Sequence, residues 1–234
     1  DKKREDKRLQ NEYSARIKLL KSDIIGARDN ITQRISFLEK HRDYLKENPF
    51  RTSRLEDCPS EMYCRMSSSN RENIFLALTN LNIPNPEKIL HNFYSIPDYL
   101  TPSIKEIREI VDNHSNETYK YLVVIRDAAE HIYSVSRQNG WLNFNPIDCI
   151  IEFTNKVTKC LDPKGESRFD LLRSIFISFE LEVQQLIRSN AYKEYEKQFI
   201  EFATLSKNAI TAYSYIETGA KQIVISESTA INEY

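Results

Sequence analysis

One segment of the chain combines residue types that could do chemistry at a regular spacing. It reads Arg126-Asp127-Ala128-Ala129-Glu130-His131, inside a stretch with helical periodicity. A guanidinium, a carboxylate and an imidazole are groups that bind anions and exchange protons near neutral pH. The candidate catalytic residues are therefore Arg126, Asp127 and His131.

An Arg followed directly by a polar residue and, after four intervening positions, by a His resembles the R-x4-6-H signature of HEPN-type ribonucleases. The resemblance implies a helical bundle that dimerises and brings two copies of the motif into one cleft. It also implies that Arg126 stabilises developing phosphate charge, that His131 transfers a proton or orients the 2′-hydroxyl, and that Asp127 holds its neighbours. The implied reaction is cleavage of RNA without an added metal ion.

The same residues also have a structural interpretation. Arg126 with Glu130, and Asp127 with His131, are i,i+4 pairs of a kind that stabilises an exposed helix face by about 0.2–0.5 kcal/mol each. Five positions rotate Arg126 and His131 by about 140° around an ideal helix, so a shared site needs a helix end or a second subunit. We favour the structural interpretation, because the resemblance covers this segment alone.

Other chemistry has little support in the sequence. With four glycines in the chain, neither G-x-G-x-x-G nor G-x-x-x-x-G-K-[ST] is present, and no G-x-S-x-G elbow occurs. His41, His91 and His114 stand apart from one another, without the spacing of a metal site. We therefore expect no cofactor and no bound metal.

The four cysteines do not form an obvious disulfide framework. Cys149 and Cys160 share a predicted helix, where eleven positions correspond to about 16 Å of rise, too far for a disulfide. Cys58 and Cys64 could close a small loop in an oxidising compartment, but their spacing is not that of a zinc knuckle. The oxidation state of Cys58 and Cys64 stays open.

Charge and hydropathy limit the partners. With a formal net charge of -1, the molecule as a whole does not attract nucleic acid or anionic lipid. No apolar run approaches the ~20 residues that span a bilayer. The chain begins at Asp1 with a segment rich in Lys and Arg over residues 2–8, as often follows a membrane helix on its cytoplasmic side. We expect a cytoplasmic protein, either tethered through a segment upstream or simply beginning in a solvated helix.

The elements that position these residues are predicted to be long helices. Residues 9–45 contain no proline and carry an apolar residue every seventh position, which is typical of a coiled-coil seam. This ladder is Ile17, Ile24, Ile31, Leu38 and Leu45. Its companion series turns polar along the chain and is Tyr13, Leu20, Ala27, Arg34 and His41. The ladder predicts self-association, or an intramolecular helical partner.

Further helices are expected over 72–81, from Thr101-Pro102 to Gly140 with an interruption at 113–116, and over 146–161. Trp141 should anchor the following loop on the core. A last helix begins at the N-cap Ser167 and could continue to Gly219, with an extended tail over 222–226. The predicted divisions are a coiled-coil-like helix over 1–48, an irregular connection over 49–71 and a helical domain over 72–234, which could form one domain with 1–48.

The sequence thus predicts an all-α fold: a bundle of long helices with a coiled-coil-like N-terminal helix that could pair antiparallel with a long C-terminal helix. The favoured function is a non-enzymatic interaction or scaffold domain that binds a protein partner or a second copy through the first helix. The alternative is a HEPN-like ribonuclease or toxin-type effector, with RNA as substrate. The enzyme question is open, and a membrane would be reached only through residues upstream of this chain.

Overall fold

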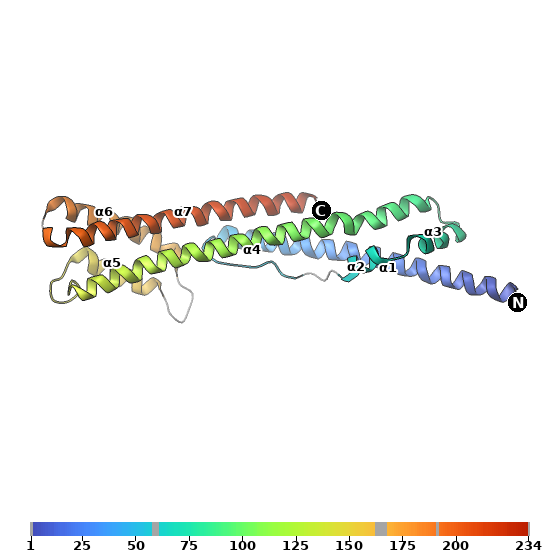
Figure 1. Cartoon of the computed structure of the whole chain (residues 1–234), viewed down its shortest axis with the longest axis horizontal. Helices are drawn as coiled ribbons and strands as arrows, with labels where there is room; N and C mark the ends of the chain where they lie inside the picture. The colour runs from blue at the N-terminus through green and yellow to red at the C-terminus, as the bar shows by residue number, and fades with distance from the viewer. Residues whose placement is uncertain (1, 58–60, 162–167, 191, 234) are drawn as a thin grey trace. The chain divides into compact units, whose positions relative to one another are not determined.

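The computed structural model describes residues 2–57, 61–161, 168–190 and 192–233, and over these ranges its regular structure is entirely helical (Figure 1). The helices are α1 (Lys2–Glu47), α2 (Glu61–Ser68), α3 (Arg71–Asn80), α4 (Pro86–Gln138), α5 (Asp148–Cys160), α6 (Phe169–Ser189), the short 3₁₀ helix η1 (Lys193–Tyr195) and α7 (Glu196–Glu233). The predicted all-α fold class is confirmed. The predicted N-cap Ser167 lies outside the described residues.

The chain forms two compact units that are each assembled from distant segments. The first unit comprises Asp1–Asp43, Arg54–Val111 and Ile225–Tyr234, and the second comprises Tyr44–Ser53 and Asp112–Val224. The helices α1, α4 and α7 therefore contribute residues to both units. The division into 1–48, 49–71 and 72–234 stays a prediction, although α2 adds a helix inside the segment that was expected to be irregular.

The first and last long helices pack against each other, as the sequence allowed. In the first unit, Nδ1 of His41 on α1 lies 2.6 Å from Oε1 of Glu227 on α7. In the second unit, the ring of Phe50, just after α1, makes an edge contact with Tyr213 of α7 at a centroid distance of 5.3 Å. The predicted pairing of the long N-terminal helix with the long C-terminal helix is therefore confirmed.

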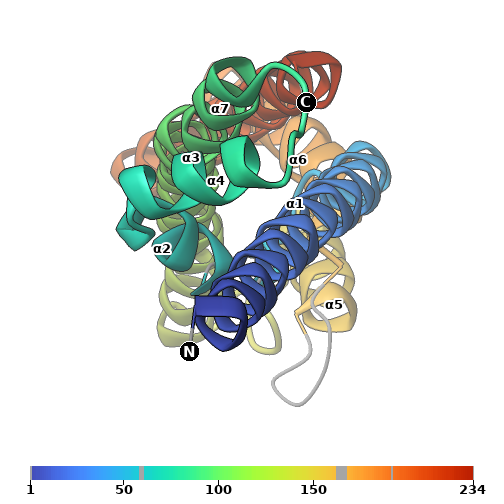
Figure 2. The ribbon, with the colours of Figure 1, turned by 90° about the vertical axis from the view of Figure 1, so that its right-hand side faces the viewer.

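The core of the first unit is built from four helices that each supply apolar side chains. Figure 2 looks along the long helices from the end at which α1 begins, with α2, α3 and the beginning of α4 near the viewer. The buried residues of this core are Leu20, Ala27, Tyr63, Met66, Ile74, Leu78, Phe93, Tyr94 and Leu100. Helix α3 begins at Asn70, whose side chain accepts a hydrogen bond from the backbone N–H of Asn73 and so caps the first turn.

The second unit has an aromatic core that α4, α5, α6 and α7 share. Phe153 of α5 stacks on Phe179 of α6 at 4.1 Å, and Phe179 lies 6.1 Å from Phe202 of α7. Trp141 is fully buried against Phe199 and Phe202, which confirms that it anchors the loop after α4. Directly before it, Gly140 has a φ of 71°, a conformation that ends α4 and that suits glycine.

Helix α4 differs from the prediction because it is continuous over 53 residues. Neither the segment at Thr101-Pro102 nor the polar stretch at 113–116 interrupts it, and Pro97 is buried within it. Its inward residues, including Phe93, Leu100 and Ile125, are almost completely buried. Burial of this face outweighs the local preference of proline and short polar residues to end a helix.

The C-terminal region also differs from the prediction, because two helices are present where one was expected. The expected single helix from 167 to 219 is divided, because Asn190 adopts a left-handed conformation with a φ of 53° and ends α6. The tail over 222–226, expected to be extended, belongs to α7, where Ile223 is buried. A helical tail satisfies its backbone groups internally and still buries this side chain.

Replacing Phe179 by Ala should destabilise the second unit by about 3–5 kcal/mol, because it removes a fully buried ring and leaves a cavity against Phe153. The measurement is urea unfolding followed by circular dichroism. Phe144→Ala is the matched control. Because Phe144 is 93% exposed, this variant should unfold at the urea midpoint of the wild-type chain. Equal midpoints for the two variants would contradict this account of the core.

Candidate functional site

The candidate catalytic residues lie within α4 in the second unit, on its solvent side. Arg126, Asp127 and His131 are all exposed, and they alternate with the fully buried Ile125, Ala129 and Ile132. His131 precedes the end of α4 at Gln138 by about two turns, so the motif is not at a helix end. A single chain therefore leaves Arg126 and His131 pointing in directions about 140° apart.

The charged partner of His131 comes from another helix. Nε2 of His131 lies 3.0 Å from Oε1 of Glu201 on α7, and both side chains are about half exposed. Over the described parts of the chain, no hydrogen bond or ion pair joins Arg126 to Glu130 or Asp127 to His131. The two i,i+4 pairs of the structural interpretation are therefore not formed, and His131 instead connects α4 to α7.

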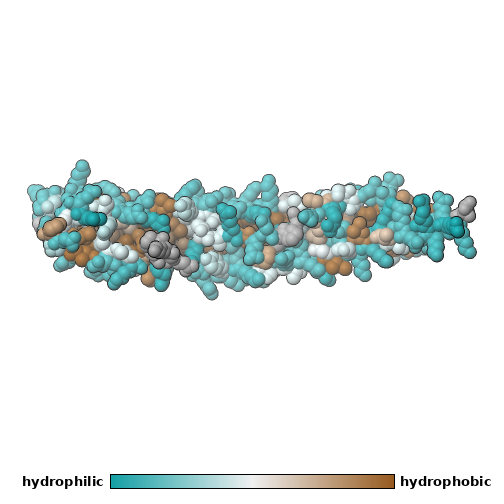
Figure 3. Space-filling model, turned by 90° about the horizontal axis from the view of Figure 1, so that it is seen from below, coloured by the Kyte–Doolittle hydropathy of each residue, from teal (hydrophilic) through white to brown (hydrophobic). Residues whose placement is uncertain are grey.

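A groove that no sequence pattern indicated lies beside this motif. It has a volume of about 350 Å³ and separates α4 from α5, with apolar walls that include Ala129, Phe153 and Val157. Two further lining residues, Glu130 and Tyr133, belong to the same segment of α4 as the motif. Figure 3 shows apolar side chains gathered at the left of the view, over α5 and the second half of α4.

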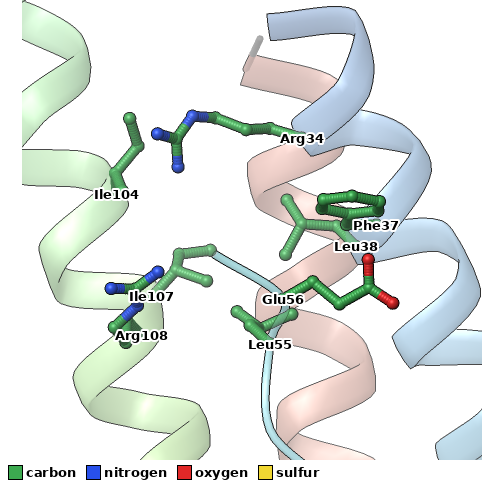
Figure 4. Close-up of a pocket in the computed structure, with 8 residues that line it drawn as sticks. All are labelled: Arg34, Phe37, Leu38, Leu55, Glu56, Ile104, Ile107 and Arg108. Atoms are coloured by element: carbon green, nitrogen blue, oxygen red, sulfur yellow. The ribbon is translucent and has the colours of Figure 1, made fainter. Parts of the chain in front are cut away.

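A smaller pocket lies in the first unit between α1, the segment after it and α4 (Figure 4). Arg34 extends from α1 and Arg108 from α4, while Leu55 and Glu56 come from the connecting segment. Its volume is about 30 Å³, which leaves room for little more than ordered water. Arg108 also pairs with Asp57, so its charge is already balanced.

A row of buried polar residues on α1 is a second feature, of which the sequence indicated only the polar end of the companion series at Arg34 and His41. Its members in the first unit are Asp23, Asn30, Arg34 and His41. Asp23 accepts from Arg65 at 3.0 Å, and Asn30 accepts both from Nε of Arg34 at 2.7 Å and from the hydroxyl of Tyr63 at 2.9 Å. The spacings of seven, four and seven residues were a visible signal that these residues share one face.

Two of the cysteines, Cys149 and Cys160, lie in environments that keep a thiol protonated. Cys149 and Cys160 both lie on α5 and are unpaired, as expected, and Cys64 is also a free thiol. Burial, assisted by the carboxylate of Glu182, raises the pKa of the Cys149 thiol to about 12. Burial likewise raises the pKa of Cys160, so both groups stay protonated near neutral pH. Cys58 lies outside the described residues.

Within the described ranges, no group of three His, Cys, Asp or Glu side chains is arranged to hold a metal ion. Across the same residues, no helix is both long enough and apolar enough to cross a bilayer. Comparison with models of protein families, with curated proteins and with solved structures gives no match.

The buried His41–Glu227 pair gives a sharp test of the polar row on α1. His41→Leu should destabilise the first unit by about 3–5 kcal/mol, because the carboxylate of Glu227, only 1% exposed, is left buried without its partner. The double variant His41→Leu/Glu227→Leu should recover most of this loss, since no charge is then buried. The free energies of unfolding from urea titrations provide the measurement.

His91→Leu is the control for this pair, because His91 is exposed on α4 of the same unit and its loss should have little effect. The effect of Glu227→Leu is compared in the wild-type chain and in the His41→Leu variant. If it lowers the free energy of unfolding equally in both, the two side chains are not coupled.

Proposed function

We propose that this chain is a non-enzymatic helical interaction domain and that it associates with a second copy of itself through α1. The observation that carries the proposal is the exposure of Ile24, 39% of which remains open to solvent at the centre of the seven-residue ladder. Its ladder neighbours Ile17 and Ile31 are only partly buried by the first core. The ladder therefore keeps apolar surface that its own unit does not cover.

The position of the buried row supports this proposal. The residues of α1 that face the core are Leu20, Asp23, Ala27, Asn30, Arg34, Leu38, His41 and Leu45. This row shares Leu38 and Leu45 with the ladder and passes beside Ile17, Ile24 and Ile31, so in the first half of α1 the flank that carries Ile24 remains available to a partner. A second copy presents the same seven-residue spacing, which is the requirement for a symmetric helical seam.

Ile24→Glu should abolish self-association, because it places a charge in the centre of the seam on both copies. Sedimentation equilibrium over a range of protein concentrations measures the effect. Leu19→Glu is the matched control: Leu19 is more exposed, at 59%, but lies about 140° from Ile24 around α1. A wild-type chain that stays monomeric at every concentration would exclude association through this ladder.

We further propose a cytoplasmic location beside a membrane. The support is the exposed start of α1, where Lys2, Lys3, Arg4, Lys7 and Arg8 face solvent. A basic segment of this kind is attracted to the anionic cytoplasmic leaflet, although Glu5 and Asp6 weaken the attraction here.

A metal-independent ribonuclease is the alternative proposal. In its favour, Arg126 and Asp127 are exposed and have no partner among the described residues, so both are accessible to RNA or to a second copy of the motif. The separation of Arg126 from His131 around α4 means that such a site needs residues from both copies. His131 is already paired with Glu201 in the single chain. RNA would therefore bind either with this pair intact or after it breaks.

If the alternative holds, Arg126→Ala and His131→Ala should each reduce RNA cleavage in EDTA by at least about 100-fold, the usual contribution of a charge-stabilising group and of a proton-transfer group. The wild-type chain and both variants are compared over a broad set of RNAs, after their helicity and oligomeric state are matched. Arg137→Ala is the control, because Arg137 is exposed on the same helix outside the motif. Absence of cleavage by the wild-type chain would leave the interaction domain as the function.

A further inference from the structure

The positive charges in the first half of α1 gather on its exposed side. Each residue of a helix is rotated by about 100° from the one before it, which places Ile25 about 140–160° from the buried Leu20 and Ala27. Within about 60° of Ile25, the charged residues at positions 3–28 are all basic, and all are exposed. They are Lys3, Arg4, Lys7, Lys18, Lys21 and Arg28. We call this side the outer face of α1.

The acidic residues of the same stretch lie on other sides of the helix, rotated by at least about 100° from Ile25. They are Glu5, Asp6, Glu12 and Asp23. Glu12 and Asp23 already form ion pairs, at 2.6 Å with Arg16 and at 3.0 Å with Arg65. The outer face ends at Asp29, which pairs with Arg28 at 2.9 Å. A chain with almost no net charge therefore carries a local row of positive charge.

The outer face is long, and most of its charges are not engaged within the chain. Helix α1 continues without a break through these residues (Figure 1), so Lys3 and Arg28 are about 38 Å apart along its axis. Lys7, Lys18 and Lys21 have no hydrogen-bonding or ionic partner among the described residues. Because the row follows one side of one helix, a flat surface can meet all of its members at once.

The other side chains of the outer face favour a lipid surface over a nucleic acid. At positions 3–28 this face contains no aromatic residue on which an unpaired base could stack. At its centre lies Ile25, which is 41% exposed and can enter the headgroup region of a bilayer. A bilayer is also flat over 38 Å, whereas the phosphate backbone of a nucleic acid duplex curves away from a straight helix.

From these observations we propose that the outer face of α1 is a membrane-binding surface that lies flat on a bilayer of anionic lipids. The lysines and arginines meet the lipid headgroups along the whole face, and Ile25 contacts the lipid at its centre. The inference rests on the location beside a membrane that is proposed above, and it extends the contact from residues 2–8 to Arg28. It is independent of self-association, because Ile24 points about 100° away from Ile25.

The test is co-sedimentation of the full chain with lipid vesicles at physiological ionic strength. One set of vesicles is pure phosphatidylcholine, and the other is an equal mixture of phosphatidylcholine and phosphatidylserine. The wild-type chain should bind the mixed vesicles and not the neutral ones, and high salt should release it.

Two double variants locate the contact along α1. Each basic side chain near an anionic bilayer contributes about fivefold to binding, so Lys18→Gln/Lys21→Gln should bind the mixed vesicles about 25-fold more weakly. Lys3→Gln/Lys7→Gln should lose a similar amount. The matched control is Lys105→Gln/Lys120→Gln, which changes the net charge equally at two exposed positions of α4 and should bind like the wild-type chain.

A second pair of variants tests which side of α1 meets the lipid. Ile25→Asp should weaken binding at least about fivefold, because it places a negative charge at the centre of the contact. Leu19→Asp makes the same change in charge at a more exposed residue, about 120° from Ile25, and should have a much smaller effect. The helicity and the sedimentation equilibrium of every variant are measured without vesicles, so that loss of folding or of self-association is detected separately.

Three results would overturn this inference. If the wild-type chain binds neither kind of vesicle, or binds both equally, the outer face does not recognise anionic lipid. If Lys18→Gln/Lys21→Gln binds like the wild-type chain while Lys3→Gln/Lys7→Gln does not, only the start of α1 touches the bilayer, and the proposed location beside a membrane stands without the flat contact. If the chain instead binds a single-stranded RNA and loses it in both double variants, the row of charges serves a nucleic acid.

Discussion

The continuity of α4 is the constraint on which the rest of the structure depends. One helix of 53 residues supplies Phe93 and Leu100 to the first core and Ile125 and Ile132 to the second. Each core thereby fixes the rotation of its own part of the helix, and the exposed residues follow from that rotation. The outward placement of Arg126, Asp127 and His131 is a consequence of burying Ile125, Ala129 and Ile132 between them.

The polar row on α1 specifies which helices pack against α1 and in which register. The seven-residue periodicity alone would allow several arrangements. A purely apolar seven-residue seam can accept several partners and registers, whereas buried polar groups accept only those that satisfy them. Asn30 meets Tyr63 of α2, and His41 meets Glu227 of α7, so shifting either helix would leave a polar atom buried without a partner. Ile24, the exposed member of the ladder, meets no such restriction within its own unit, which agrees with its proposed use between copies.

Much of this fold could be predicted from the sequence because helices with one buried face have a strong periodic signal. The all-α class, the helix over residues 72–81, the stop at Gly140 and the buried Trp141 all followed from local patterns. The course of α4 through Pro97 and Pro102 did not, since burial of residues distant in sequence overrode local preferences. The division at Asn190 was missed for a related reason: the apolar spacing continues across a residue that adopts a positive φ.

The candidate sites were less predictable than the fold. The catalytic role of Arg126, Asp127 and His131 stays a prediction, because a six-residue pattern cannot specify what a second subunit contributes. The groove depends on the packing of α4 against α5, and Thr154 is unpartnered only in that context. No sequence spacing indicates such a feature.

The burial of Trp141 has a practical consequence. It is the single tryptophan of the chain, and it is enclosed by Tyr195, Phe199 and Phe202 in the core of the second unit. Its fluorescence is therefore a native optical reporter of that unit alone, whereas helical circular dichroism averages over both. Divergence of the two signals during denaturation would reveal that the units melt separately, and coincidence would reveal a single cooperative transition.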